Sequence, residues 1–427
     1  MNKNIIVLLT GLLLSGATYA QKAKLNTANK TLQQFEQENN ANLKAGLISK
    51  AQIAINEAIE DPSTATNADV WYTRAKVYAK ASTIVENNAK EIQIGSESLA
   101  KALELNPKIA SKNDDYNLVA LELAIGNYNV GLAKFNAANY SEAYTAFGNV
   151  SVIAGEAQNK KMTEIYPMID TIRSYSYINQ GLSALNSENY ENAKIAYEKA
   201  LKDPITDKEK VIQSLIEIYE KLDDKTNQLK YIDMAVKQYP NNGNFANSQI
   251  NYYIANNMTP QLIESLESAA KANPQDPQYI FRLGLTYTDL AEKATEASKK
   301  TEHEAKAEEY YKKTLELAGD NPMYNQQLGV HYFNKGIDKQ NFANKDENRK
   351  SNAKYSALIT ERDNLFKTAE QLFEKAVAGF DKMNLSSMTG EQKESYHTSL
   401  QALGRIYASQ NNNAKQQEVT NKAKTIK

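Results

Sequence analysis

The strongest constraint on the fold is a sequence pattern with helical spacing that recurs along the chain. The segment SENYENAKIAYEKALKDP, residues 187–204, spaces Tyr190, Ala193 and Tyr197 three or four residues apart, so that they share one face of a helix. The preceding segment YINQGLSALN carries Gly181 on a second helical stretch, and NSEN predicts a turn between the two. This combination predicts a helix hairpin, in which small residues let the helices approach closely and Tyr197 fills the remaining space.

The same residue types return at similar spacing through the chain. The residues that carry the pattern are Trp71, Ala75, Tyr78, Gly131, Tyr140, Ala143, Phe147, Gly181, Tyr190, Ala193, Tyr197, Gly284, Tyr287, Gly329, Tyr332, Gly404 and Tyr407. The pattern resembles the tetratricopeptide repeat, a hairpin of 34 residues that ends in alanine, an aromatic residue, alanine and proline. The closing alanines at 200, 235 and 269 are 35 and 34 residues apart, whereas other separations are longer.

The resemblance implies an all-α fold, a right-handed superhelical solenoid of about nine stacked hairpins over residues 21–427. The low content of proline and glycine, 9 and 17 among 427 residues, also favours helices over loop-rich structure. Residues 335–364 form a charged insertion that lengthens one repeat. A projecting docking arm and a solvated, partly helical hairpin are both consistent with this segment.

Composition and motifs argue against catalysis and against a nucleic-acid partner. Basic and acidic residues balance, at 50 and 51, so no excess positive charge favours nucleic acid. The absence of cysteine removes disulfides, thiolate metal sites and thiol nucleophiles. His303 lies in HEAKA, which lacks the second histidine of a zinc-binding H-E-x-x-H motif. We therefore expect no catalytic, cofactor or metal site.

The first 20 residues have the features of a secretory signal peptide. Lys3 precedes an apolar run over residues 5–14, and Thr18 and Ala20 are small residues that favour cleavage near Ala20. The apolar run is shorter than the roughly 20 residues of a membrane-spanning helix. We expect an exported protein, periplasmic or associated with a cell-envelope complex, with no transmembrane segment after cleavage.

The resemblance also implies a binding surface, because in tetratricopeptide proteins the first helices of the hairpins line a concave groove. The residues at those positions are Tyr128, Leu132, Phe135, Tyr175, Ile178, Leu182, Phe281 and Arg282. The apolar character of these residues has two interpretations. They line an exposed groove for a partner protein, or the longer hairpins cover them and make them part of the core. The sequence favours a non-catalytic scaffold or adaptor; a holdase for exported chains and, less readily, an envelope hydrolase are the alternatives.

Overall fold

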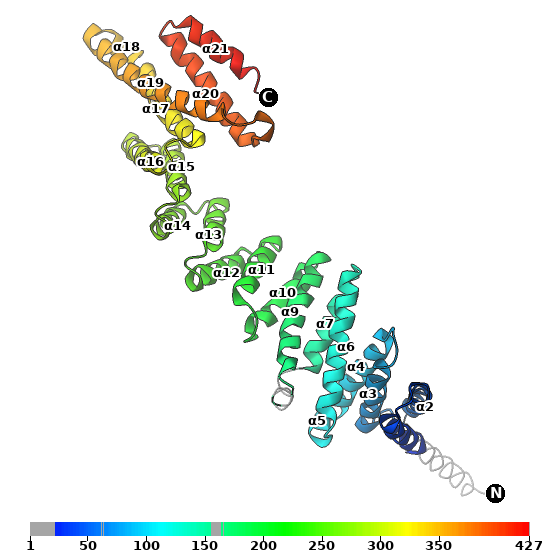
Figure 1. Ribbon diagram of the computed structural model, residues 1–427. Helices are drawn as coiled ribbons and strands as arrows, with labels where there is room; N and C mark the ends of the chain where they lie inside the picture. The colour runs from blue at the N-terminus through cyan, green and yellow to red at the C-terminus, as the bar shows by residue number, and fades with distance from the viewer. Residues whose placement is uncertain (1–21, 61, 63, 155–163, 165, 427) are drawn as a thin grey trace, which may run out of the picture. The chain divides into compact units, whose positions relative to one another are not determined.

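The computed structural model describes residues 22–60, 62, 64–154, 164 and 166–426, so the expected signal peptide lies outside the described residues. Every regular element in these ranges is a helix. The chain divides into two compact units, Met1–Ala235 and Val236–Lys427, which are described separately. The predicted all-α architecture of stacked helix hairpins is confirmed within each unit (Figure 1).

In the N-terminal unit, a helix over residues 22–37 precedes α2. The further helices are α2 (Ala41–Ile59), α3 (Ala68–Ser82), α4 (Ala89–Leu105), α5 (Ile109–Lys112), α6 (Tyr116–Asn136), α7 (Tyr140–Ile153), α9 (Met168–Asn186), α10 (Tyr190–Lys202), α11 (Lys208–Lys221) and α12 (Lys225–Gln238), whose last residues enter the second unit. Helices α3 and α4, α6 and α7, and α9 and α10 pair as hairpins, and each hairpin also contacts the next (Figure 1).

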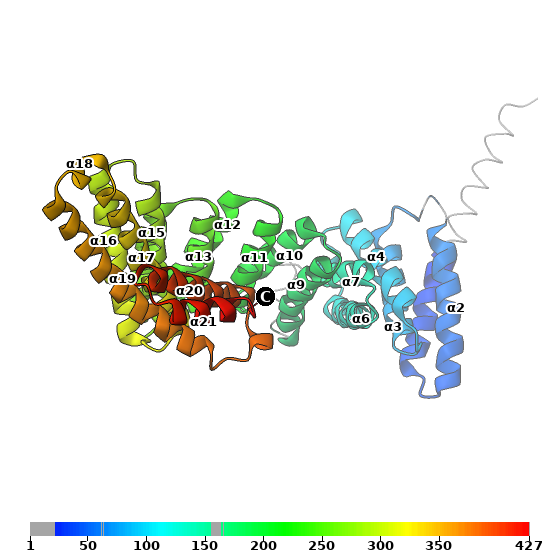
Figure 2. The same cartoon turned by 90° about the horizontal axis from the view of Figure 1, so that it is seen from above.

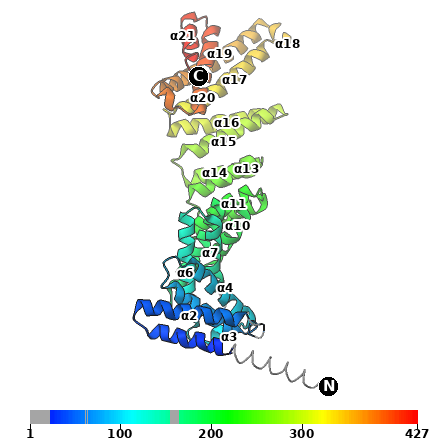
Figure 3. The same cartoon turned by 90° about the vertical axis from the view of Figure 1, so that its right-hand side faces the viewer.

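The C-terminal unit repeats this arrangement. Its elements are α13 (Gly243–Ala255), α14 (Thr259–Ala272), α15 (Pro277–Lys293), α16 (Ala297–Leu317), α17 (Pro322–Ala343), α18 (Asp346–Arg349), α19 (Asn352–Phe380), the 3₁₀ helix η1 (Leu385–Ser387), α20 (Gly390–Ser409) and α21 (Asn413–Ala423). Helix α15 pairs with α16 (Figure 3), and α17 with α19 and α20 with α21 (Figure 2).

The charged insertion is a helical extension of the α17–α19 hairpin. These two helices are 22 and 29 residues long, and the short α18 connects them. Gly336 lets the Phe366 ring pack against α17, because a Cβ at this glycine would lie 2.5 Å from the ring. Further along, Arg362 donates a hydrogen bond to Gln340. The insertion therefore continues the packing of the hairpin instead of forming a separate loop.

One contact recurs between the two helices of a hairpin: an aromatic ring on the second helix covers a glycine on the first. A Cβ built on each of these glycines would lie 2.5–2.9 Å from a ring carbon. The pairs are Gly131 with Phe147, Gly181 with Tyr197, Gly284 with Tyr311, and Gly329 with Phe373. Real Cβ atoms do not approach so closely, so only glycine permits this helix separation.

The turns between paired helices also share one geometry. Ala138, Glu188, Asp223, Asn257 and Asn411 each follow a first helix and have φ between 51° and 59°. The next amide donates a hydrogen bond five residues back, as from the nitrogen of residue 139 to the oxygen of residue 134 at 2.8 Å. This is the Schellman motif, which satisfies carbonyls at a helix end. None of the five is glycine, but three are asparagine or aspartate, which adopt the left-handed region more readily than other non-glycine residues.

Neighbouring hairpins are connected by tyrosine hydroxyl groups. Each tyrosine lies on a first helix and donates to a glutamate on the second helix of the preceding hairpin, at 2.7–2.8 Å. The pairs are Tyr219 with Glu198, Tyr332 with Glu308, and Tyr407 with Glu374. Because these hydrogen bonds join a fixed position of one hairpin to a fixed position of the next, they set the register of the stack.

Glu308 has the densest set of partners among these carboxylates. It accepts hydrogen bonds from Lys312 and Lys335, each at 2.8 Å, and from Tyr332, and the His331 Nε2 atom lies 3.5 Å away. His331 makes the largest contribution to holding the pKa of Glu308 far below its usual value, and the lysines and Tyr332 add to it. Burial opposes these contacts without cancelling them.

We expect Gly181→Ala to lower the free energy of unfolding of the N-terminal unit by about 1–3 kcal/mol, because the added methyl group overlaps the buried Tyr197 ring. The control is Gly46→Ala, at an exposed position inside α2 with no atom within 4 Å of the new Cβ. This control should raise the free energy of unfolding by up to about 1 kcal/mol, because alanine has a higher helix propensity than glycine. Urea titrations followed by circular dichroism measure both effects, and equal shifts in the two variants would contradict the contact.

We expect Glu308→Gln to destabilise the C-terminal unit at pH 7 by about 1–3 kcal/mol, because charged hydrogen bonds are lost. Since the folded-state pKa is depressed, the stabilisation is fully present above the usual glutamate pKa and declines progressively as the pH falls toward the folded-state pKa. In urea titrations, the deficit of the variant relative to the wild-type protein should therefore shrink as the pH is lowered from 7 to 3. Glu309→Gln, at an exposed neighbouring position, should show little effect at either pH, and a constant deficit of Glu308→Gln across pH would argue against this account.

Candidate partner-binding pocket

A pocket of about 690 Å³ lies in the N-terminal unit between α9, the loop that follows α10, and α11. Its apolar wall consists of Tyr175, Ile178 and Leu182 from α9, Ile205 from the loop and Val211 from α11. We call this site the Tyr175 pocket. The structure thus brings together three of the residues that the sequence placed in a binding groove.

Helical spacing explains why this wall faces solvent. Tyr175, Ile178 and Leu182 are three and four residues apart, so they lie on one side of α9, whereas Gly181 lies on the side that packs against α10. Tyr175 is 54% exposed and Ile205 is 50% exposed, which is high for side chains of this size. Of the two interpretations that the sequence left open, exposure is therefore the one found at this position.

Polar groups of both charges surround the apolar wall. Asp207 caps the start of α11, where its side chain accepts a hydrogen bond from the amide of Lys210. Lys210 and Glu217 line the pocket on α11, with Asn179 on α9. Tyr197 also lines the pocket, and its burial raises the pKa of its hydroxyl group. A few oriented polar groups around an apolar surface are typical of binding sites.

The predicted groove residues of α6 are only partly exposed to solvent. Tyr128 is half-buried with its ring edge-on to Phe147, at a centroid separation of 5.7 Å. Its hydroxyl oxygen accepts a hydrogen bond from the Asn179 amide at 3.4 Å, which links α6 to α9. Phe135 is half-buried against the ring of the first residue of α7, and Leu132 is exposed. These residues therefore contribute to packing as well as to the surface.

Phe281 and Arg282 lie on α15 in the C-terminal unit, so they belong to a different part of the fold. Phe281 is half-buried, and its ring centroid lies 4.6 Å from that of Tyr324 and 5.9 Å from that of Tyr311. It therefore joins neighbouring hairpins. One terminal nitrogen of Arg282 is buried without a hydrogen-bond partner among the described residues.

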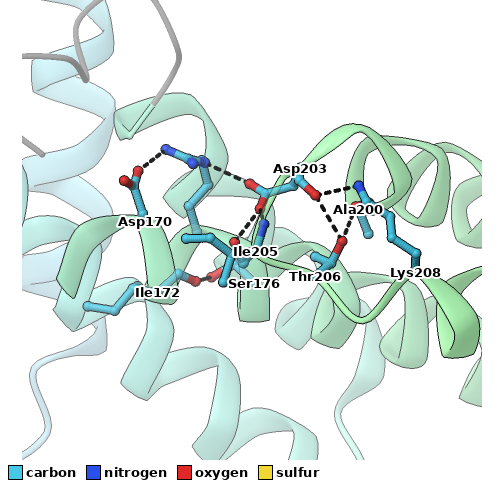
Figure 4. Close-up of polar contacts among 10 residues, drawn as sticks. Asp170, Ile172, Ser176, Ala200, Asp203, Ile205, Thr206 and Lys208 are labelled. Atoms are coloured by element: carbon cyan, nitrogen blue, oxygen red, sulfur yellow. Dashed lines mark hydrogen bonds and ion pairs between the residues drawn. The ribbon is translucent and has the colours of Figure 1, made fainter. Parts of the chain in front are cut away.

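A buried ion-pair network supports the pocket from one side. Asp203 follows α10 and accepts hydrogen bonds from Arg173 Nε at 3.1 Å and Ser174 Oγ at 2.5 Å. Arg173 also donates to Asp170 at 2.6 Å. The carbonyl oxygen of Asp203 accepts from Lys208 at 2.6 Å, so this residue joins α9 to the start of α11 (Figure 4).

Asp203 also shapes the loop itself. One of its carboxylate oxygens accepts a hydrogen bond from the amide of Ile205 at 3.0 Å, and its carbonyl accepts from the Thr206 hydroxyl at 3.1 Å. These bonds hold the loop in a fixed conformation (Figure 4). The exposed Ile205 side chain in the pocket wall is positioned by buried polar contacts beneath it.

No sequence motif marks Asp203 or Arg173. The KDP triplet stands out only for its closing proline, and the arginine lies 30 residues earlier with no motif to connect them. The i, i+3 spacing of Asp170 and Arg173 is a signal for a local ion pair. The contact between Arg173 and Asp203 becomes evident only from the packing of α9 against α10.

The described residues include no group of three or more histidine, cysteine, aspartate or glutamate side chains placed to hold a metal ion. Within the same ranges, no helix has both the length and the apolar content needed to cross a membrane.

Several solved structures are similar to this chain, whereas no family model and no curated protein sequence matches it. Among solved structures, it is similar to the C-terminal part of a TPR repeat-containing protein from Cytophaga hutchinsonii, with 13% identity, 70% of this chain and 95% of that one covered, and a TM-score of 0.46. A TPR repeats protein from Bacteroides fragilis has 21% identity over 54% and 97% of the two chains, with a TM-score of 0.37.

A further similar structure is YrrB, described as a TPR protein with an unusual peptide-binding site. It has 18% identity over 52% of this chain and 93% of its own, with a TM-score of 0.29. These solved structures are tetratricopeptide repeat proteins, the class that the sequence resembled.

We expect Asp203→Ala to destabilise the N-terminal unit by about 3 kcal/mol, because Arg173 would remain buried with one carboxylate partner fewer. Replacing both residues, as in Arg173→Met with Asp203→Leu, should recover much of this loss. Urea titrations of the single and double variants test the coupling. Purely additive losses would show that the two side chains do not depend on each other.

Proposed function

We propose that the protein is a non-catalytic scaffold or adaptor that binds a segment of a partner protein in the Tyr175 pocket. The observation that carries this proposal is the exposure of Tyr175, Leu182 and Ile205 side by side on a helical stack whose hairpin interfaces are well buried. Contiguous exposed apolar side chains commonly mark an interaction surface. Burying them against a partner would remove this surface from water.

The composition of the pocket favours a protein segment as the ligand. Its rim presents the carboxylates of Asp207 and Glu217, the Lys210 ammonium group and the Asn179 amide. A polypeptide offers matching donors, acceptors and charges of both signs around an apolar side chain. A polyanion would meet both carboxylates, which disfavours nucleic acid at this site.

We further propose that this scaffold acts in the periplasm or at the cell envelope, in association with an envelope complex. The support is the arrangement of Lys3, the apolar run over residues 5–14 and the small residues before Gln21. Mass spectrometry of the N-terminus after expression in a bacterium with an intact export pathway tests this placement. A mature chain that begins at Gln21 in the periplasmic fraction supports export, and a full-length chain in the cytoplasm contradicts it.

The binding proposal is tested by photo-crosslinking from position 178 of every protein in intact envelopes, with partners identified by mass spectrometry. The test variant combines Tyr175→Ala, Leu182→Ala and Ile205→Ala. The matched control combines Leu43→Ala and Ile53→Ala, which remove exposed apolar side chains from α2 without touching the pocket. We expect one defined partner with the wild-type and control proteins and at least about tenfold weaker capture with the test variant.

Other results would point elsewhere. Equal capture by the test variant and the control would remove the Tyr175 pocket as the binding surface. Suppression of aggregation of several unrelated unfolded proteins, lost in the test variant, would favour a holdase over a dedicated adaptor. Turnover of an envelope substrate by the purified chain would contradict a non-catalytic role.

A further inference from the structure

The Tyr175 pocket contains one carboxylate without a cationic partner. Its charged lining residues are Asp207, Lys210 and Glu217. The Asp207 carboxylate lies 3.4 Å from the Lys210 ammonium nitrogen, so these two charges offset each other. Glu217 accepts a hydrogen bond from the neutral amide of Gln213 at 3.3 Å, but among the described residues no lysine or arginine lies within ion-pair distance of it. The lining therefore carries one unpaired negative charge.

Glu217 lies at the end of the pocket remote from the loop that follows α10. The Asp203 network holds the start of α11 beside Ser174 on α9, which defines the loop end. Glu217 lies in the last turns of α11. Burial raises the pKa of the Tyr197 hydroxyl group most, and the negative charge of Glu217 adds to the rise, so this carboxylate lies close to the ring that covers Gly181. The loop and the carboxylate are therefore at opposite ends of the pocket.

The distance between the two ends defines a spacing for a bound segment. Tyr175 and Ile205, at the loop end, are the most exposed apolar side chains of the lining. Gly181, near the other end, follows Tyr175 by six positions in α9, which corresponds to about 9 Å of helix. An extended chain covers this distance in about three residues. A segment whose apolar side chain packs at the loop end therefore brings the residue three positions away to Glu217.

The polar groups between the two ends favour an extended segment. Asn179 on α9 and Gln213 on α11 line this part of the pocket. The backbone amide and carbonyl groups of an extended segment have no partners of their own, whereas those of a helix are paired internally. The side-chain amides of Asn179 and Gln213 supply both donors and acceptors for such backbone groups.

The unpaired carboxylate determines which charge a bound segment must carry. At other junctions between hairpins the chain supplies the cation itself: Glu308 lies 2.8 Å from each of two lysine nitrogens, and Glu374 lies 3.1 Å from that of Lys415. A segment that covers the Tyr175 pocket without a cation would remove water from Glu217 and leave it unpaired, which is unfavourable. A lysine or arginine in the segment removes this cost, whereas an acidic residue adds repulsion.

We propose that the Tyr175 pocket selects an extended segment of a partner protein in which a lysine or arginine lies three residues from a large apolar residue. The apolar side chain packs against Tyr175 and Ile205, and the basic side chain pairs with Glu217. This inference rests on the proposed function of the pocket and adds the chemistry of the segment that it binds. Glu217 is then the residue that determines specificity, because it sets the charge of the preferred segment.

The test uses the chain over residues 21–427 and a fluorescein-labelled peptide, Gly-Arg-Ser-Ser-Phe-Ser-Ser-Arg-Gly, in fluorescence anisotropy titrations. This arginine peptide has a basic residue three positions from the phenylalanine on both sides, so it satisfies the spacing in either chain direction. The glutamate peptide replaces both arginines with glutamate. We expect the arginine peptide to bind at least about fivefold more tightly at low salt, and added salt to reduce the difference, because Glu217 is exposed before binding.

Variants of Glu217 locate this preference on the protein. Glu217→Lys should reverse it in favour of the glutamate peptide, and Glu217→Gln should remove it without reversal. The matched control is Glu220→Lys, an exposed position on the same helix outside the pocket, which should keep the wild-type preference. Circular dichroism checks that each variant folds. An unchanged preference in folded Glu217→Lys would overturn the proposal.

A further variant, Tyr175→Ala with Ile205→Ala, separates this inference from the proposed function. If both peptides bind the wild-type protein equally and this variant weakens both, the pocket binds apolar segments without charge selection, and only the inference is overturned. If neither peptide binds at millimolar concentration, the inference is also overturned, and the photo-crosslinking experiment decides the proposed function independently. Binding of the arginine peptide that this variant leaves unchanged would place the peptide outside the pocket and overturn the inference.

Discussion

The packing of an aromatic ring onto a bare glycine determines the helix separation in four of the described hairpins, α6–α7, α9–α10, α15–α16 and α17–α19. Because the ring occupies the volume where a Cβ would lie, the two helices have one permitted separation at that position. The ring is buried in every such contact, so it cannot move aside without exposing apolar surface. The turns then connect helices whose spacing is already fixed, and the tyrosine–glutamate hydrogen bonds join one hairpin to the next.

The same contact determines which surface remains for binding. On α9, Gly181 turns one side of the helix toward Tyr197, so the side that carries Tyr175 and Leu182 is left to face the loop after α10 and α11. The loop is held by Asp203, whose partners lie beneath the pocket wall. A rigid apolar surface costs less entropy on binding than a mobile one, because its side chains are already ordered.

Local patterns in the sequence were sufficient to predict the hairpins, because glycine, aromatic and alanine positions recur with helical spacing. They were insufficient for the binding surface. Ile178 and Leu182 line the Tyr175 pocket, whereas Tyr128 and Phe135 are half-buried against rings of their own hairpin. The exposure of a groove side chain depends on how closely the next helices pack over it. That packing is determined by contacts between residues remote in sequence, such as the one between Arg173 and Asp203.

The structure of the insertion over residues 335–364 was also only partly evident from the sequence. Its charge pattern indicated solvent exposure, and its length was compatible with either an arm or a hairpin. The structure shows two lengthened helices that repeat the glycine–ring contact with Gly336 and Phe366. The residue pair was present in the sequence, but a separation of 30 positions concealed it.

The long α17–α19 hairpin illustrates how such a chain can change over evolution. Each hairpin contacts mainly its neighbours, so residues added near a turn extend away from those contacts and leave the rest of the stack in place. A globular core would have to be repacked to accept about thirty additional residues. A stacked architecture can therefore acquire length, and with it new surface, one hairpin at a time, while selection acts on the other hairpins independently.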